Sequence, residues 1–265
     1  MHLLRVFIKV VKCLFRAKLE YPGAFLGGSV AQLFSYGVFM VLLFITVWNF
    51  GTLAGWLPME IIFMFAMWLF TYALGASFTF TMCQEFPRMA IEGTLDEAYT
   101  RPLPPFLYLM ATNFNVAYVA HISLTIAALV VSMVQLGLSW TVFQWVWFVV
   151  IIISGAVINA CMMLICDMPA IRTRSQSPTG MFFWNLRDFS QYPLTIFPRA
   201  IQFVFTAVLP FGFVSFYPVQ VLLGKQDGIL PGVMMWMAPV VAVLLVGVTA
   251  LCWRTLSSKY ESAGT

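Results

Sequence analysis

Residues 102–166 read PLPPFLYLMATNFNVAYVAHISLTIAALVVSMVQLGLSWTVFQWVWFVVIIISGAVINACMMLIC and contain no Asp, Glu, Lys or Arg. One membrane-spanning helix needs about 20 predominantly apolar residues, so this stretch has room for two. The segment QLGLSW at 135–140 interrupts it with turn-forming residues and a Trp, which is typical of a membrane–water boundary. The stretch therefore predicts two spans, over about 107–134 and 142–166.

The rest of the chain repeats this pattern, and its charge-free stretches predict four further spans, over about 25–48, 59–83, 200–219 and 231–253. Hydrophobic residues make up 62% of the chain and charged residues only 9%, against about 25% charged in a typical soluble domain. This composition excludes a soluble globular enzyme, a disordered regulator and a disulfide scaffold, and the strands of an outer-membrane barrel would alternate instead. We predict an all-α polytopic membrane protein with six transmembrane helices, in which residues 1–265 form a single transmembrane domain.

The basic residues lie on one side of the predicted membrane. Of the 14 Lys and Arg residues, all but Lys225 fall in the N-terminal segment, in the second and fourth loops or in the C-terminal tail. Cytoplasmic segments carry the excess of Lys and Arg, so both termini are expected in the cytoplasm.

The first 22 residues have two chemically different faces when they are placed on a helix. The basic face carries Arg5, Lys9, Lys12 and Arg16, and the apolar face carries Leu4, Phe7, Ile8, Val11 and Leu14. Such a segment is typical of an amphipathic helix on the inner leaflet, so residues 1–22 are expected to lie there. The simpler alternative is a positive flank that only orients the first span. Basic residues recur through Lys18 without a cleavable apolar core, which does not fit a signal peptide.

The predicted spans hold almost no group that could drive uphill transport. His121 is the one ionisable side chain in a span interior, and a structural role for it is more common than a proton relay. Glu60 falls at the outer end of the second span. The segment Gly224-Lys225-Gln226 lacks the remaining residues of a nucleotide-binding P-loop. The five Cys residues match no metal or redox spacing and are expected to be free thiols, so we predict no metal site, no catalytic residue and no cofactor bound by this chain.

The second loop, 84–106, has the most unusual charge pattern. It holds four acidic and two basic residues on a side of the membrane that is otherwise basic. Gly93 suits a helix C-cap, Thr94 with Glu97 forms a capping-box pattern, and Pro102 favours a helix end. We therefore expect two short helices broken at Gly93 that form a docking surface for a protein, with a solvated turn as the alternative.

Several segments together resemble small ABC transporter permeases of the type-2 export class. The loop segments Glu92 to Asp96 (EGTLD) and Arg101 to Leu103 (RPL) resemble the cytoplasmic loop of these permeases. Three later segments resemble their motifs around the fifth span and at the C-terminus: FSQYPLTIFP at 189–198, LPFGFVSFYP at 209–218 and YESAG at 260–264. The resemblance covers essentially the whole chain in order. This chain carries Glu92 where the family often has a basic residue.

The resemblance implies a permease subunit of an ABC exporter, which is not itself an enzyme. It implies two ABC ATP-binding subunits that hold ATP and Mg²⁺, a second permease of similar or identical sequence, and a place in the bacterial cytoplasmic (inner) membrane amid its lipid. It also implies that the loop couples to the ATPase through Glu85, Arg88, Glu92, Gly93, Thr94, Leu95, Asp96, Glu97 and Arg101. No nucleic-acid partner is expected. The alternatives are a secondary carrier or channel that acts without an ATPase, and a membrane-embedded scaffold.

Small residues recur every fourth position at the start of the first span, as Gly23, Gly27, Ala31 and Ser35. This spacing lets helices approach closely. It predicts either a face toward the partner permease or packing within the subunit.

The region around the fifth span contains two prolines, Pro210 and Pro218, which should break or kink a helix. We expect the span to stop near Pro218 and residues 219–230 to form a re-entrant or surface segment on the outer side. The neighbouring aromatic residues are then candidates for an outer gate or, alternatively, for lipid contact; they are Phe211, Phe213, Phe216 and Tyr217.

Overall fold

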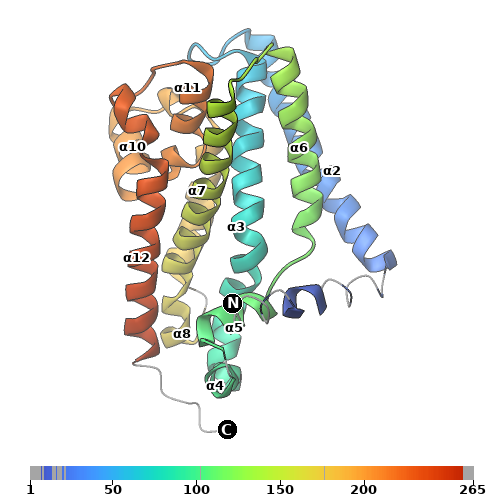
Figure 1. Cartoon of the computed structure of the whole chain (residues 1–265), viewed down its shortest axis with the longest axis vertical. Helices are drawn as coiled ribbons and strands as arrows, with labels where there is room; N and C mark the ends of the chain where they lie inside the picture. The colour runs from blue at the N-terminus through green and yellow to red at the C-terminus, as the bar shows by residue number, and fades with distance from the viewer. Residues whose placement is uncertain are drawn as a thin grey trace.

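The computed structural model describes residues 7, 9–13, 16, 20, 22–101, 103–175 and 177–258. Within these ranges the regular elements are helices, and five of them are long and apolar enough to cross a membrane. The long elements are α2 (Pro22–Phe50), α3 (Pro58–Glu92), α6 (Tyr118–Gln135), α7 (Val142–Asp167) and α12 (Ala238–Ser257), which the 3₁₀ turn η5 (Gly232–Met237) precedes. Figure 1 shows them standing side by side, with the short helix α4 (Thr94–Thr100) at the lower end, which we call the cytoplasmic end after the orientation that the sequence predicts. The predicted all-α polytopic fold is confirmed.

Helix α3 forms the centre of the bundle, and 83% of its most apolar window is buried within the chain. It contacts α6 and α7 along its length and α2 less extensively. The closest approach is to α7 at Gly75, where an added Cβ would lie 2.5 Å from the carbonyl oxygen of Ala156. A glycine is required here because any side chain would push the two backbones apart.

The fifth pass through the bundle differs from the expected helix over 200–219. The hydroxyls of Ser177 and Thr179 donate to the carbonyl of Cys166, at the cytoplasmic end of α7. From there α9 (Pro178–Arg187), η1 (Asp188–Gln191) and η2 (Leu194–Ile196) rise along α3. Phe197 lies beside Phe50 and Leu53, at the outer end of α2. Residues 177–197, which the sequence analysis placed in a cytoplasmic loop, therefore make this pass.

The segment expected to be the fifth span is a bent pair of helical pieces in the outer half of the bundle. It runs from α10 (Arg199–Phe203) through a π-helical turn (Val204–Val208) and the 3₁₀ turn η4 (Phe211–Phe213) to α11 (Phe216–Leu223), with a bend of 76°. The break lies at Pro210, as predicted.

The prediction that the helix stops near Pro218 is wrong. Helix α11 continues through Pro218 to Leu223. The loop between α11 and η5 therefore covers only residues 224–231, whereas the expected outer segment covers 219–230. The proline sits in the first turn of α11, where backbone N–H groups have no helical acceptor, so a missing N–H is tolerated there.

Two other predicted boundaries also shift. The third span begins at Tyr118 rather than at 107, because α5 (Pro105–Thr112) ends and the chain turns over 113–117. The second span does not end at 83, because α3 continues to Glu92.

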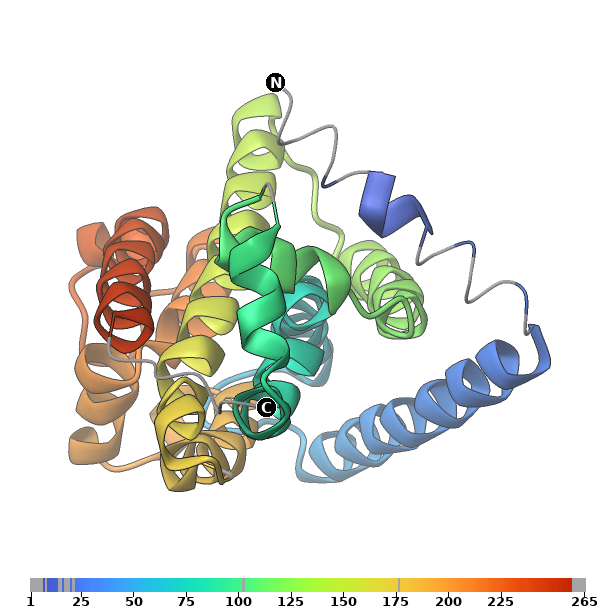
Figure 2. The ribbon, with the colours of Figure 1, turned by 90° about the horizontal axis from the view of Figure 1, so that it is seen from below.

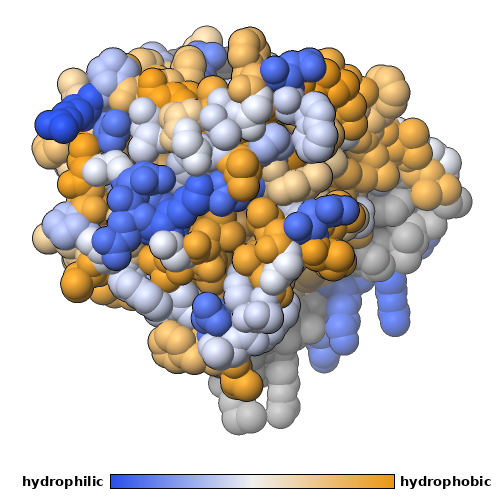
Figure 3. All heavy atoms as spheres, turned by 90° about the horizontal axis from the view of Figure 1, so that it is seen from above, coloured by the Kyte–Doolittle hydropathy of each residue, from blue (hydrophilic) through white to orange (hydrophobic). Residues whose placement is uncertain are grey.

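An ion pair at the outer end of the bundle joins the start of α3 to the loop after α11. The Nζ atom of Lys225 lies 2.6 Å from a carboxylate oxygen of Glu60 and donates to the carbonyl of Gly55 at 3.2 Å. The same ammonium lies 4.7 Å from the ring centre of Trp56. Figure 3 looks onto this end, where hydrophilic residues form a patch among hydrophobic neighbours.

Helix α2 lies at the edge of the bundle, and only 11% of its most apolar window is buried. Figure 2 shows it apart from the other helices at its cytoplasmic end. Before it, the described residues 9–13 are helical, with Lys9 and Lys12 exposed and Val10 and Val11 half-buried. This pattern fits the two faces expected of the N-terminal helix, of which Leu4, Arg5, Ile8 and Leu14 lie outside the described residues.

The first prediction concerns the contact between α3 and α7. Replacing Gly75 with Ala places a methyl group against the Ala156 carbonyl, and we expect overpacking to lower the free energy of unfolding by about 1–3 kcal/mol. Thermal unfolding in detergent measures this loss. The matched control is Gly37→Ala on α2, where an added Cβ meets nothing within 4 Å. Equal melting temperatures for the two variants would contradict the close contact.

Candidate functional site

The second cytoplasmic loop forms a platform below the bundle, which we define as residues 84–112 without the undescribed Pro102. It consists of the last turns of α3, the short helix α4 (Thr94–Thr100) and α5. Figure 1 shows α4 as the lowest helix of the molecule. The chain turns between α3 and α4 at Gly93, whose φ of 70° lies in the left-handed region that favours glycine. The predicted break at Gly93 is confirmed, but the first helical piece is part of α3 rather than a separate short helix.

The predicted capping box at Thr94 and Glu97 is wrong. Thr94 is already helical, Gly93 is the N-cap residue, and no side chain caps the helix. Glu97 instead accepts hydrogen bonds from Arg101 and, at 3.2 Å, from the Tyr108 hydroxyl on α5. These two hydrogen bonds lower the pKa of the Glu97 carboxyl below its ordinary value, and the bond from Arg101 has the larger effect. Glu97 therefore ties α4 to α5 rather than starting α4.

The platform separates packing residues from surface residues. Leu95 and Ala98 are buried, with 2% and 0% exposure, so they hold α4 in place. Ile91 and Tyr99 keep 54% and 46% of their surface exposed, and the Glu92 side chain is 50% exposed. Arg88 lies 2.5 Å from Glu85 and 3.9 Å from Glu92 along the same helix face. The surface available to a partner is thus a mixed acidic and apolar one.

The small residues of α2 are all exposed. Gly23, Gly27, Ala31 and Ser35 lie on the outside of the chain. An added Cβ at either glycine would meet no described atom within 4 Å. No described part of this subunit packs on these two glycines.

The four aromatic residues of the predicted outer gate are buried within the chain at 5% exposure or less. Phe211 packs on Phe183 of α9, with ring centres 5.5 Å apart, and Phe216 packs on Trp56, with ring centres 5.8 Å apart. The Tyr217 hydroxyl is 2.7 Å from that of Thr206. None of them faces lipid, while their role as a gate stays a prediction.

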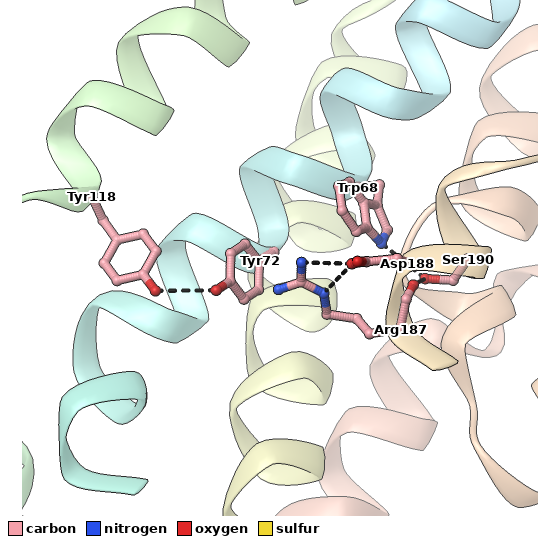
Figure 4. Close-up of polar contacts among 6 residues, drawn as sticks. All are labelled: Trp68, Tyr72, Tyr118, Arg187, Asp188 and Ser190. Atoms are coloured by element: carbon pink, nitrogen blue, oxygen red, sulfur yellow. Dashed lines mark hydrogen bonds and ion pairs between the residues drawn. The ribbon is translucent and has the colours of Figure 1, made fainter. Parts of the chain in front are cut away.

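An ion pair between a buried arginine and a largely exposed aspartate lies at the end of α9, as Figure 4 shows. The Arg187 guanidinium donates to one carboxylate oxygen of Asp188 at 2.8 and 3.2 Å. It also lies 3.9 Å from the ring centre of Tyr72 and 5.0 Å from that of Trp68. Only 7% of the Arg187 side chain is exposed, against 60% for Asp188.

Further hydrogen bonds fix this pair against α3. The Ser190 hydroxyl donates to the Arg187 carbonyl at 2.6 Å and accepts from the Trp68 indole at 2.8 Å. The hydroxyls of Tyr72 and Tyr118 lie 3.1 Å apart, which extends the polar contacts to α6 (Figure 4). Trp68 and Tyr72 are 10 and 14 residues below the start of α3, or about 15–21 Å at 1.5 Å per residue. The ion pair thus lies at mid-membrane depth.

The comparisons with known proteins then identify the family. The model of the ABC-2 family transporter proteins matches residues 33–264. The chain belongs to the ABC-2 transporter family. It is therefore a membrane permease component of an ABC transporter, a class that works with ABC ATP-binding subunits and is generally not itself catalytic. Neither a curated protein nor a solved structure matches it.

Sequence reasoning missed the Arg187–Asp188 pair of this ABC-2 permease. Both residues fall in the predicted fourth loop, because the sequence analysis placed charged residues outside the spans. The sequence feature that could have located the two residues is their position directly before the FSQYP segment at 189–193. His121 is buried, and its ring lies 4.5 Å from that of Tyr36 and 5.0 Å from that of Tyr118, while the structural role expected for it stays a prediction.

The second prediction concerns this ion pair in the permease. Replacing Arg187 with Met leaves the Asp188 carboxylate at mid-membrane depth without its cation, which lowers stability. Adding Asp188→Asn removes that charge and should recover about 1 kcal/mol of the loss, since Asp188 is partly exposed. A double-mutant cycle of melting temperatures in detergent measures the coupling. Simple additivity of the two substitutions would contradict the pairing.

Proposed function

We propose that this chain is the permease subunit of an ABC exporter that forms half of the translocation pathway. Separate ATP-binding subunits, two per complex, bind ATP and Mg²⁺ and supply the energy. The observation that carries the proposal is the platform: it extends below the bundle as a continuation of the central helix α3, at the cytoplasmic end of the chain. A movement imposed on the platform is transmitted directly into the membrane through α3.

The docking surface is the exposed part of the platform. Ile91 and Glu92 belong to the last turn of α3 and are exposed on it. Glu97 and Arg101 bond to each other and so shape the surface of α4, while Gly93 sets the angle between α3 and α4. Leu95 acts indirectly, since it is buried and positions α4.

The second permease covers the side of the chain that α2 and η1 share. Asp188 has a largely exposed carboxylate at mid-membrane depth, and charged groups at that depth face protein or water rather than lipid. Next to it a groove of about 500 Å³ runs between α2 and the residues of η1 and η2, lined by Phe39, Leu43, Phe189, Tyr192 and others. This side therefore faces the partner permease and the pathway between the two subunits.

The outer part of the pathway involves the bent pair α10–α11. Phe211, Phe213, Phe216 and Tyr217 fill its inner side. In the proposed cycle this packed cluster is the closed state of the outer gate, and it separates when ATP brings the partner subunits together. The complex resides in the bacterial cytoplasmic membrane.

The third prediction tests the coupling to the ATPase. Replacing Ile91 and Glu92 together with Ala removes exposed contacts without disturbing the buried Leu95, and we expect about tenfold weaker binding of the ATP-binding subunits. Co-purification and substrate-stimulated ATPase activity measure the loss. The matched control is Val134→Ala at the outer end of α6, a side chain that is 73% exposed. Unchanged assembly of the double variant would refute the platform as the docking surface.

The fourth prediction tests the permease interface. A cysteine at Ala31, in a chain that lacks the exposed Cys13, should crosslink to a second permease and double the apparent mass of the subunit. The control is Val243→Cys on α12, which is 72% exposed and lies away from α2. Crosslinks from position 31 that form only within one chain, or that form equally from position 243, contradict the proposed interface.

A further inference from the structure

A groove on the opposite side of the bundle has no role in the proposed pathway. It encloses about 350 Å³ between α3, α5, α7 and α12. Small residues are part of its lining, among them Thr79, Ala160 and Ala250, and their short side chains leave the space open. The remaining wall is almost wholly apolar and includes Val157, Leu164 and Val246.

The groove lies in the cytoplasmic half of the membrane. Val157 and Leu164 are 15 and 22 residues from the start of α7, or about 22–33 Å below the outer end of that helix. The hydrocarbon core is about 30 Å thick, so Val157 is at the depth of inner-leaflet acyl chains and Leu164 is close to the level of the headgroups. Helix α12 forms one edge of the groove. The side of α12 away from the groove is mostly exposed, and Val243 and Leu244 point outward there.

The cytoplasmic end of the groove carries a positive charge. Arg254, in the last turn of α12, lines the groove and forms no ion pair with any described residue. The neighbouring Trp253 packs edge-on against Phe106 of α5, with ring centres 5.2 Å apart. A Trp beside an Arg is typical of the level where lipid headgroups begin.

We propose that this groove binds one anionic phospholipid of the cytoplasmic leaflet. Its acyl chain lies on the apolar wall, and its phosphate pairs with Arg254. An apolar channel that ends, at headgroup depth, in a cation without an ion-pair partner among the described residues matches both parts of such a lipid, whereas a lipid without net negative charge satisfies only the apolar part.

The bound lipid connects the platform to the last helix. Phe106 and Met110 of α5 form one wall of the groove, and Val246 and Ala250 of α12 form another. The only ring contact between these two helices in the described part of the chain is that of Phe106 with Trp253. A lipid tail that fills the space above this contact therefore supports α5 in its position beside α4.

The fifth prediction tests the lipid site by native mass spectrometry of the purified permease. The protein is released from nanodiscs of equimolar phosphatidylglycerol and phosphatidylethanolamine, and the retained lipids are counted. Wild type should retain phosphatidylglycerol in preference to phosphatidylethanolamine. Arg254→Gln should reduce this preference about fivefold, the factor that corresponds to about 1 kcal/mol for one basic residue at an anionic membrane surface. Ala250→Trp fills the groove and should remove the tightly held lipid of either kind.

Two matched controls separate the site from general effects. Arg199→Gln removes an equal charge from an exposed position on α10, and Val243→Trp adds an equal side chain to the outward face of α12. Both should retain lipid as wild type does. An unchanged lipid preference in Arg254→Gln overturns the proposal, and so does equal lipid loss in Val243→Trp and Ala250→Trp. Either result can be told apart from a failure of the docking proposal, because Ile91 and Glu92, which test the docking, do not line the groove.

Discussion

The close packing of α3 on α7 determines where every other part of the molecule lies. Gly75 meets the backbone of α7 at Ala156, and Gly155 of α7 meets the Thr71 side chain and the carbonyl of Val214. In a membrane, helices associate through such close contacts because lipid provides little hydrophobic driving force. With α7 fixed on one side of α3, helix α6 and the irregular fifth pass occupy the others, and α2 remains at the edge. The platform is held in place by the same contacts, because it begins as the last turns of α3.

A buried guanidinium at mid-membrane depth sets a second constraint. The aromatic faces of Tyr72 and Trp68 and the carboxylate of Asp188 surround Arg187 and offset the cost of removing it from water. These partners come from α3 and from the turn after α9, so the fifth pass is held in register with the central helix. An unbroken apolar helix in this place would pack against α3 in several registers. The ion pair and the Ser190–Trp68 hydrogen bond favour a single one.

Most of the fold was predictable because membrane depth imposes a strong and simple pattern. The long charge-free stretches predicted α2 and α7 nearly to their ends, and α12 once the preceding turn η5 is included. The orientation stays a prediction, and the fold removes two residues from its cytoplasmic count, since Arg187 lies at mid-membrane depth and Arg199 begins α10 in the outer half of the bundle. The fifth pass was mislocated for the same reason: residues 177–197 contain Arg187 and Asp188, and a pattern that treats charge as a sign of water excludes them. The capping pattern at Thr94 failed because Gly93 in a left-handed conformation already turns the chain, which frees Glu97 to bond α5. The exposure of the small residues on α2 could not be predicted, because it depends on how the whole bundle packs and no local sequence pattern describes that packing.

The position of Gly75 also gives α3 the properties of a lever. Seventeen residues precede Gly75 in the helix and seventeen follow it, from Pro58 to Glu92, so the contact with α7 divides the rod into two arms of about 26 Å each. If the helix pivots as a rigid rod at this point, its two ends move by equal amounts. A sideways displacement of Glu92 is then returned in the opposite direction, and at nearly the same size, at the outer end of α3, where the pairing of Glu60 with Lys225 resists it.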